Sequence, residues 1–353
     1  MDAAVNGLSV DFLVETAAAL EVDNWERVSP LFIRRQFVGV QGTFLLVGPY
    51  TTRRGGGETT KLTAVYGQVI PHEKIEGLED QLRKTFGALG QDVPEIIPVR
   101  IIAACGMVGG ESGEAFIVPD GWRFPGSEVG PALNDMHEQR RRLKAGFKCI
   151  RRIFAPTSAK LLLNLFEDQQ HGMLIQHREY SYHEAGHSAG VGLRSKLSEN
   201  LLPTPWSRAI EEWRSDGVEF DLATRILPTE QAAQVVLANF TIRFGVDAHR
   251  GGGPECDTDV AAALLTFDRL WENGALDIEK GRLIFTDPSD RGLVRAVEQH
   301  RIEAVRLTFD EMRIKHKTAL GSLYGSVPLS RQSKAIFRTY VTEPCGGFFT
   351  ALR

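Results

Sequence analysis

Cysteine is scarce in this sequence. The chain has four cysteines in 353 residues, they lie far apart, and no CxxC pair occurs among them. A thiolate zinc site or a dense disulfide framework needs cysteines at short, recurring spacings. We therefore expect neither of these two arrangements in this protein.

Long apolar runs and an excess of basic residues are missing as well. No segment approaches the roughly 18 consecutive apolar residues that a membrane helix needs. The amino terminus carries Asp2 and no Lys or Arg before its apolar stretch, which is the wrong charge for a signal peptide. The formal net charge of -4 argues against a nucleic-acid partner, which selects for a basic surface. We expect a cytoplasmic protein that binds neither nucleic acid nor a membrane.

The composition that remains is that of a globular protein, with 42% hydrophobic and 24% charged residues. In the first third of the chain, the sequence predicts short helices and strands in turn. The pattern predicts a helix over residues 9 to 21, strands over 35 to 48 and 61 to 70 that could pair as a hairpin, a helix over 73 to 89, and strands over 96 to 104 and 115 to 118. Because residues 121 to 130 are rich in Gly and Pro, we place a domain boundary there. Residues 1 to 130 are thus predicted to form a small α+β domain of unknown role.

The remainder of the chain has helical periodicity. Amphipathic patterns recur over residues 133 to 154, 176 to 197, 206 to 215, 228 to 245, 257 to 273 and 291 to 319. Residues 131 to 353 should therefore form a mainly helical domain. The predicted fold class of the whole chain is α+β.

The run His183-Glu184-Ala185-Gly186-His187 carries the strongest chemical signal. Histidines at positions i and i+4 share one face of a helix, so both imidazoles can reach a single metal ion. A glutamate directly after the first histidine can take a proton from water that the metal has made acidic. The run predicts one zinc ion per chain, with Glu184 as the catalytic base.

Two questions about this run stay open in the sequence. Ser181 and Glu184 also fit a capping box, in which Glu184 would serve a helix end and not a metal. A catalytic zinc ion further needs a third protein ligand, and no histidine follows closely enough to complete a compact HExxHxxGxxH pattern.

The third ligand can be inferred from a resemblance. The run YHEAGH resembles the peptidase domain of the FtsH family of zinc proteases, in which an aspartate ligand follows the HEAGH helix by some seventy-odd residues. The stretch Pro254 to Ala263 looks similar to the family's aspartate segment, and the resemblance implies that Asp259 completes the site with His183 and His187. Asp257 and His249 remain alternatives. The sequence has no GxxxxGK[ST] run, so the family's ATPase module is not expected.

These observations predict a soluble, ATP-independent zinc metallopeptidase or amide hydrolase. The substrate would be a peptide or a flexible protein segment, and the protein could form oligomers. Two other classes stay open. The fold could survive as an inactive peptidase-like scaffolding protein, or the same His, His and Asp ligands could hold iron in a non-haem metal enzyme.

Overall fold

The computed structural model describes residues 42–54, 57–72, 75–87, 89, 92–105, 116–117, 132–189, 205–247, 258–313 and 331–342, together with residues 14 and 18. The chain divides into two compact units. One comprises Met1–Lys74 and Pro94–Arg141, and the other comprises Ile75–Val93 and Arg142–Arg353. The boundary expected over residues 121 to 130, and most of the helix expected over 9 to 21, lie outside the described residues.

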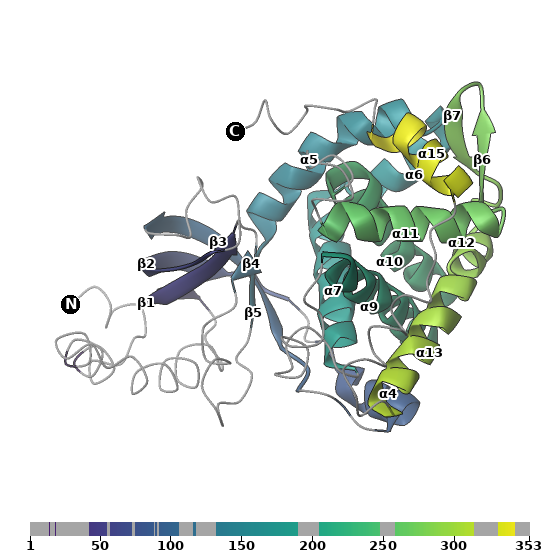
Figure 1. The fold of residues 1–353 in the computed structure, drawn as a ribbon. Helices are drawn as coiled ribbons and strands as arrows, with labels where there is room; N and C mark the ends of the chain where they lie inside the picture. Colours follow the sequence, from purple (N-terminus) through teal and green to yellow (C-terminus); the bar gives the residue numbers. More distant parts are fainter. Residues whose placement is uncertain are drawn as a thin grey trace. The chain divides into compact units, whose positions relative to one another are not determined.

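The first unit contains a five-stranded sheet (Figure 1). The strands are β1 (Thr43–Arg54), β2 (Gly57–Val69), β3 (Ile96–Cys105), β4 (Phe116–Ile117) and β5 (Ala132–Asp135), in the order β1-β2-β3-β5-β4. β1 and β2 form the expected antiparallel hairpin, with Thr43 opposite Gln68. β3 pairs in parallel with β5, the one parallel pairing among the described strands of this sheet. Both hairpin strands extend beyond the predicted ranges toward each other, to Arg54 in β1 and Gly57 in β2.

The second unit is built mainly of helices. They are α4 (Leu78–Phe86), most of α5 (Met136–Ile153), α6 (Pro156–Asn164), α7 (Gln169–Ser188), α9 (Pro205–Ile226), α10 (Thr229–Thr241), the π-helical turn η2 (Ile242–Val246), α11 (Thr258–Glu272), α12 (Asp290–Ala296), α13 (Glu298–Arg313), α15 (Arg331–Phe337) and the π-helical turn η4 (Arg338–Thr342). A small hairpin of β6 (Leu276–Glu279) and β7 (Arg282–Phe285) joins α11 to α12. The helices and sheets match the predicted α+β class, although the hairpin was not predicted.

Local sequence signals account for several of these boundaries. Pro156 begins α6, where its missing N–H costs nothing. The Asp168 carboxylate accepts a hydrogen bond from the backbone N–H of His171 at 2.7 Å and so caps α7. The two-residue turn between β6 and β7 has positive φ at both Lys280 and Gly281, which suits the twist of a tight hairpin.

The core of the helical unit is rich in aromatic side chains. Phe240 and Phe285 stack with their ring centroids 5.9 Å apart, and Phe154, Phe244 and Phe267 are fully buried around them. Burying each such ring stabilises the fold by about 1.5–3 kcal/mol. In the described part of the chain, no helix is both long and apolar enough to cross a membrane.

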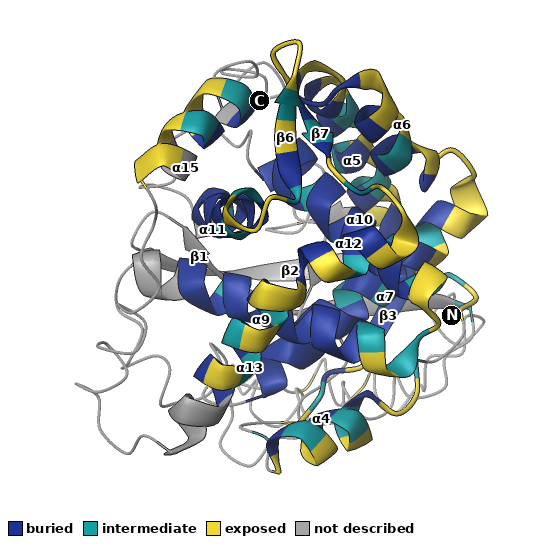
Figure 2. Cartoon of the chain, turned by 90° about the vertical axis from the view of Figure 1, so that its right-hand side faces the viewer, coloured by how far each residue is buried: buried dark blue, intermediate teal, exposed yellow. Residues whose placement is uncertain are grey.

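Helix α9 lies at the centre of this unit. It packs against α7, α11 and α13, and nearly every residue from Ala209 to Ala223 is buried (Figures 1 and 2). A central helix is usually apolar all round. This one instead buries five acids and an arginine, namely Glu211, Asp216, Glu219, Asp221, the partly exposed Glu212, and Arg214. Burying ionised groups costs free energy that only well-placed partners offset, so the acids of α9 indicate a functional site on this helix.

Candidate metal centre

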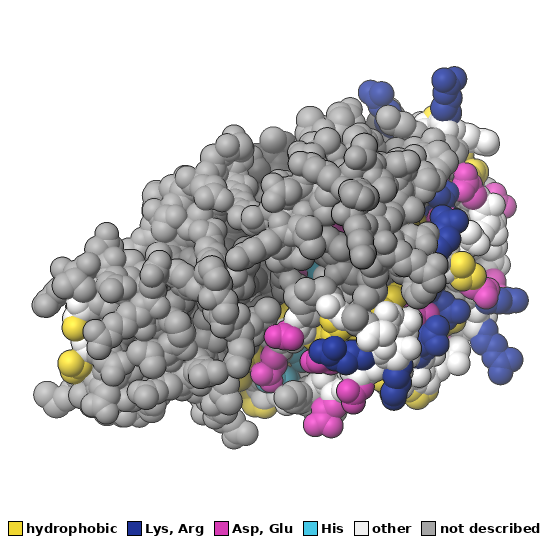
Figure 3. All heavy atoms as spheres, turned by 60° about the horizontal axis from the view of Figure 1, so that its bottom comes forward, with side chains coloured by type: hydrophobic (Ala, Val, Ile, Leu, Met, Phe, Trp, Pro, Cys, Tyr) yellow, Lys and Arg dark blue, Asp and Glu magenta, His cyan; other side chains and the backbone are white. Residues whose placement is uncertain are grey.

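Surface charge on the described part of one face gives little indication of function. On the face that Figure 3 shows, acidic and basic side chains of the described residues are interspersed. The buried charges between α7 and α9 are more informative, because each needs a specific partner.

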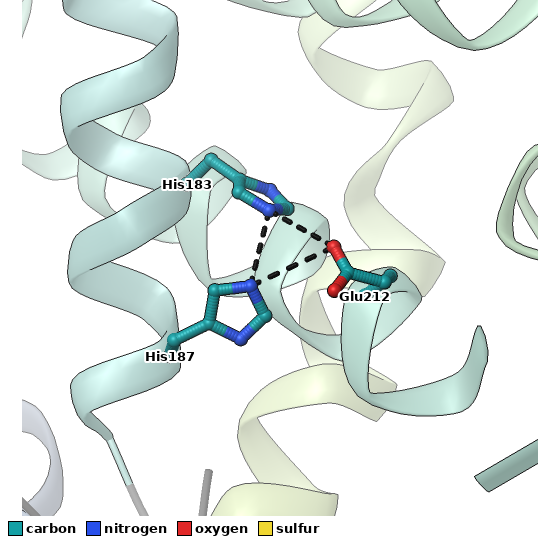
Figure 4. Close-up of side chains that lie close together, drawn as sticks. All are labelled: His183, His187 and Glu212. Carbon is teal, nitrogen blue, oxygen red and sulfur yellow. Dashed lines mark hydrogen bonds and ion pairs between the residues drawn. The ribbon is translucent and has the colours of Figure 1, made fainter. Parts of the chain in front are cut away.

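Helix α7 presents two histidines to α9. His183 and His187 lie one turn apart, and their Nε2 atoms are 3.2 Å from each other, with the two rings nearly perpendicular at 88° (Figure 4). Gly186 lets the helices approach this closely. A Cβ at that position would lie 2.5 Å from the Ser215 Oγ and 2.8 Å from the Ser215 backbone oxygen. The glycine of the HEAGH run is therefore a packing requirement of the α7–α9 interface.

Helix α9 supplies a carboxylate to the same point. The Glu212 Oε2 lies 3.2 Å from the His183 Nε2 and 3.6 Å from the His187 Nε2. Figure 4 shows the three side chains converging from the two helices. Two nitrogens and one oxygen thus form a compact triangle of metal-ligating atoms.

The other ring nitrogens of the two histidines face carboxylates. The His183 Nδ1 lies 2.9 Å from the Asp216 Oδ1, and the His187 Nδ1 lies 3.2 Å from the Glu211 Oε1. A carboxylate only accepts, so each Nδ1 donates its proton there. With each Nδ1 proton held in this way, a metal would displace the proton of each Nε2 and use its lone pair, as metal-binding histidines require.

Two buried arginines hold these carboxylates in turn. Arg214 donates to both oxygens of Glu211, at 2.7 and 2.5 Å, and also to the Thr308 hydroxyl on α13 at 2.6 Å. Arg243 in η2 donates to both oxygens of Asp216, at 2.8 Å each. Each histidine therefore belongs to a chain of arginine, carboxylate and imidazole.

These contacts shift the titration of the cluster. Burial alone would lower the pKa of His183 and of His187, but the neighbouring carboxylates overcome that effect and raise both pKa values. Burial would likewise raise the pKa of Glu212, yet the two histidines hold the pKa of this carboxyl well below its usual range. In the absence of metal the triangle consequently retains protons on its imidazoles.

A second group of possible metal donors shares one histidine with the first. The His183 Nδ1, Asp216 and Glu219 lie close enough to hold an ion. However, the Asp216 oxygens already accept two hydrogen bonds from the Arg243 guanidinium, so a cation there would meet an existing positive charge. The first triangle is farther from this positive charge, since the Arg243 Nη2 lies 3.9 Å from the Glu212 Oε2 and 2.8 Å from the Asp216 Oδ1.

One turn before His183 on α7 the charges are not matched. Glu179 and Glu219 are buried, and the Glu179 Oε2, Glu219 Oε1 and Asn239 Oδ1 have no hydrogen-bond partner. The Glu219 Oε2 accepts a hydrogen bond from the Asn239 Nδ2 at 3.2 Å. Burial raises the pKa of Glu179 to about 8 and that of Glu219 well above its usual value, so burial favours the protonated form of both carboxyls.

The structure places some of the predicted site residues together, places Asp259 elsewhere, and does not describe the two alternatives. His183 and His187 converge, and Glu184 is buried beside His183 on α7. Asp259 belongs to neither group of donors within ligating distance. Its Oδ1 lies 3.8 Å from the Arg243 Nη1, in the first turn of α11. The alternatives Asp257 and His249 lie outside the described residues.

The capping-box interpretation of Glu184 is wrong. Helix α7 begins at Gln169 with Asp168 as its N-cap, so Ser181 lies well inside the helix. The Ser181 hydroxyl donates to the His177 backbone oxygen at 2.8 Å and not to a helix end.

Sequence reasoning missed Glu212. The predicted helix over residues 206 to 215 contains it, but no residue of that helix was predicted to belong to the site. The usable signal was the spacing of Glu212, Asp216 and Glu219, which puts three acids on one face of a helix. A solvated face would pair such acids with Lys or Arg one turn away, whereas these acids face the histidines of α7.

The fold and the site together define a helical protein with a buried imidazole–carboxylate cluster, and its fold resembles that of a known protein. The solved structure of DPP III from Caldithrix abyssi superposes with a TM-score of 0.64 and 12% sequence identity, over 97% of this chain and 67% of that chain. At this identity the likeness concerns the fold. No curated protein matches the sequence.

A family model matches residues 3–240, and the chain belongs to that family, DUF6014, a family of unknown function. The predicted resemblance to the FtsH peptidase is wrong. The matching family is a different one, its match begins in the amino-terminal unit, and the solved structure that shares the fold is DPP III. The similarity to FtsH rested on the run YHEAGH and on the stretch Pro254 to Ala263, and the i, i+4 histidine spacing of that run is shared by any helical histidine pair of this kind.

Proposed function

We propose that this protein is a zinc-dependent hydrolase whose metal ligands are His183, His187 and Glu212. The observation that carries the proposal is the triangle of donor atoms, with sides of 3.2, 3.2 and 3.6 Å. Ligands placed tetrahedrally at about 2.0–2.1 Å from zinc are about 3.3–3.4 Å apart. The side chains therefore already have the separations that one zinc ion would impose.

The kind of donor also fits zinc. Two imidazoles and one carboxylate are a common protein contribution to a catalytic zinc site, which keeps a further position open. The carboxylates on each Nδ1 fix the imidazole tautomer that ligation needs, and such partners strengthen metal binding. The same three donors could hold iron, so elemental analysis is part of the test below.

Zinc bound there would acidify a water molecule and polarise the carbonyl group of a substrate. Glu184 follows His183 directly on α7 and is the candidate general base. Its carboxylate would accept a proton from the attacking water and return it to the leaving amine. Arg214 and Arg243 hold the surrounding carboxylates in place, so these carboxylates remain available to the histidines during turnover.

The substrate class comes from the fold. Since the chain shares its fold with DPP III, a dipeptidyl peptidase, we propose peptides as substrates and amide hydrolysis as the reaction. The buried acids around the triangle favour a substrate that brings positive charge, because they outnumber the buried arginines.

The first test is elemental analysis of the purified protein together with a peptide-library cleavage screen. We expect one zinc ion per chain in the wild type and in Glu184→Gln, with cleavage in the variant reduced by about 100-fold or more. Glu230→Gln, which changes an exposed glutamate on α10, should keep both zinc and activity. A wild-type protein that takes up no zinc when zinc is supplied would overturn the proposal.

A further inference from the structure

We propose that Arg243 is a positioning residue of the metal centre, acting on His183 through Asp216. This inference rests on the proposed zinc site and extends it to a residue that touches neither histidine. Arg243 lies just beyond the stretch that the family model matches, in the π-helical turn η2. Turns of this kind occur often at functional sites.

The geometry of the Arg243 contact to Asp216 is that of a two-pronged clamp. The Nε donates to the Asp216 Oδ2 and the Nη2 donates to the Asp216 Oδ1, both at 2.8 Å. Two parallel hydrogen bonds fix the plane of the carboxylate as well as its position. The Asp216 Oδ1 then receives the proton of the His183 Nδ1 at 2.9 Å, so the orientation of the imidazole follows that of the clamp.

Arg243 is itself anchored on the other side. Its Nη1 donates to the Asp247 Oδ2 at 2.9 Å, and the Asp259 Oδ1 lies 3.8 Å from the same nitrogen. With every nitrogen of the guanidinium directed at an acid and the side chain 6% exposed, Arg243 has little freedom to move. Asp259, which the sequence suggested as a ligand, thus lies beside the arginine that supports the site.

Asp216 has no comparable alternative support from the described residues. The Ser215 hydroxyl next to it donates to the His183 backbone oxygen and does not reach the carboxylate. Without the clamp, the carboxylate could rotate about its own side chain and carry the His183 hydrogen bond with it. A lysine in place of Arg243 would keep the positive charge but provide a single point contact, so it would not fix the plane of the Asp216 carboxylate.

Arg243→Lys is the direct test, with Arg225→Lys as matched control. Arg225 also bonds an aspartate of α9, the Asp221 Oδ2 at 2.6 Å, but this pair is partly exposed and does not contact a histidine. The measurements are the zinc dissociation constant, by competition with a chelator, and the absorption spectrum of the cobalt-loaded protein. We expect Arg243→Lys to bind zinc about 10-fold more weakly with an altered cobalt spectrum, and Arg225→Lys to match the wild type in both.

The possible outcomes separate the two proposals. A wild type that binds zinc, with a folded Arg243→Lys whose affinity and spectrum are unchanged, overturns the role of Arg243 and leaves the zinc site intact. A wild type that binds no zinc removes both proposals. If Arg243→Lys does not fold, Asp247→Asn replaces it, because that change loosens the anchor and leaves the clamp in place. We expect weaker zinc binding in Asp247→Asn, and unchanged binding there overturns the inference.

Discussion

Two neighbouring turns of the α7–α9 interface both bury carboxyl groups, but they accommodate them in different ways. At His183 and His187, each acid that faces a histidine lies within reach of a cation, either an arginine or the imidazole itself. One turn away, Glu179 before His183 on α7 and Glu219 after Asp216 on α9 are buried, each with an unpaired oxygen and no arginine bonded to it among the described residues. The first turn keeps its carboxylates ionised, whereas the second keeps them neutral with protons.

This difference supports the proposed position of the metal. Ionised carboxylates and imidazoles whose other nitrogen is already hydrogen-bonded are ready to ligate, and they release their protons when a metal enters. Burial opposes the ionised form of Glu179 and Glu219, whereas it is outweighed at Glu212 by the two histidines, so the turn at Glu179 and Glu219 is a poorer metal site despite its acids. The same helix pair thus carries side by side the turn that we propose as the metal site, called here the metal-binding turn, and a turn that holds protons, the proton-holding turn.

The largest expected effect is on the metal-binding turn. Glu212→Gln removes the charged donor of the triangle, so zinc affinity should fall at least about 100-fold, more than the loss of a supporting residue costs. Asp259→Asn serves as the control. The Asp259 side chain is 27% exposed, and its Oδ1 lies 3.8 Å from the Arg243 Nη1, a contact worth about 0–1 kcal/mol. The zinc affinity of the Asp259→Asn variant should therefore fall by less than about fivefold. Equal losses in the two variants would return Asp259 to the ligand set.

The next effect concerns the proton-holding turn and depends on pH. Burial raises the folded-state pKa of Glu179 from 4.5 to about 8, so its contribution to stability is present below pH 4.5 and is lost as the pH rises through 8. Glu179→Gln removes that loss, and the variant should be more stable than the wild type above pH 8 by on the order of 2–4 kcal/mol. Urea unfolding at pH 5 and pH 8.5 measures this difference. Equal stability of the two proteins at pH 8.5 would contradict it, and Glu230→Gln should show no such dependence.

The smallest expected effect comes from two glycine variants, which distinguish a change in helix packing from a change in metal binding. Gly186→Ala should destabilise the fold by about 1–3 kcal/mol, because its Cβ would meet Ser215. Gly217→Ala is the matched change, since its Cβ would meet Ala304 and His300 of α13 on the other side of α9. Both variants should melt at lower temperature, but only Gly186→Ala should also weaken zinc binding. Equal zinc affinity in the two would mean that the α7–α9 distance does not control the triangle.

The sequence predicted the parts of the site that lie within one helix. The i and i+4 spacing of His183 and His187 fixes their common face wherever the helix lies, so their convergence follows from local geometry. The helical pattern of the second unit and the β1–β2 hairpin were also predicted, because their periodicity is local. The long pattern over residues 291 to 319 is two helices in the structure, α12 and α13.

The contacts between helices could not be predicted in this way. Glu212 reaches the histidines because α9 packs on α7 at Gly186, and a hydrophobic pattern does not state which helix lies beside which. The assignment of Asp259 relied on a resemblance that proved wrong, and the structure places this residue beside Arg243. Charge within a predicted helix was the overlooked signal, since Glu211, Glu212 and Asp216 are buried where an ordinary helix would place leucine or alanine.

The number of residues in the π-helical turn Ile242–Val246 determines where Arg243 and Asp247 point. Its hydrogen bonds span one residue more than those of an α-helix, so the turn contains a residue that a regular helix would not hold. Deleting one residue there would restore the regular helix and rotate the following side chains by about 100° relative to those before. Arg243 and Asp247 would then no longer share a face with Asp216. For this stretch, a deletion that changes no remaining side chain should do more harm than most substitutions.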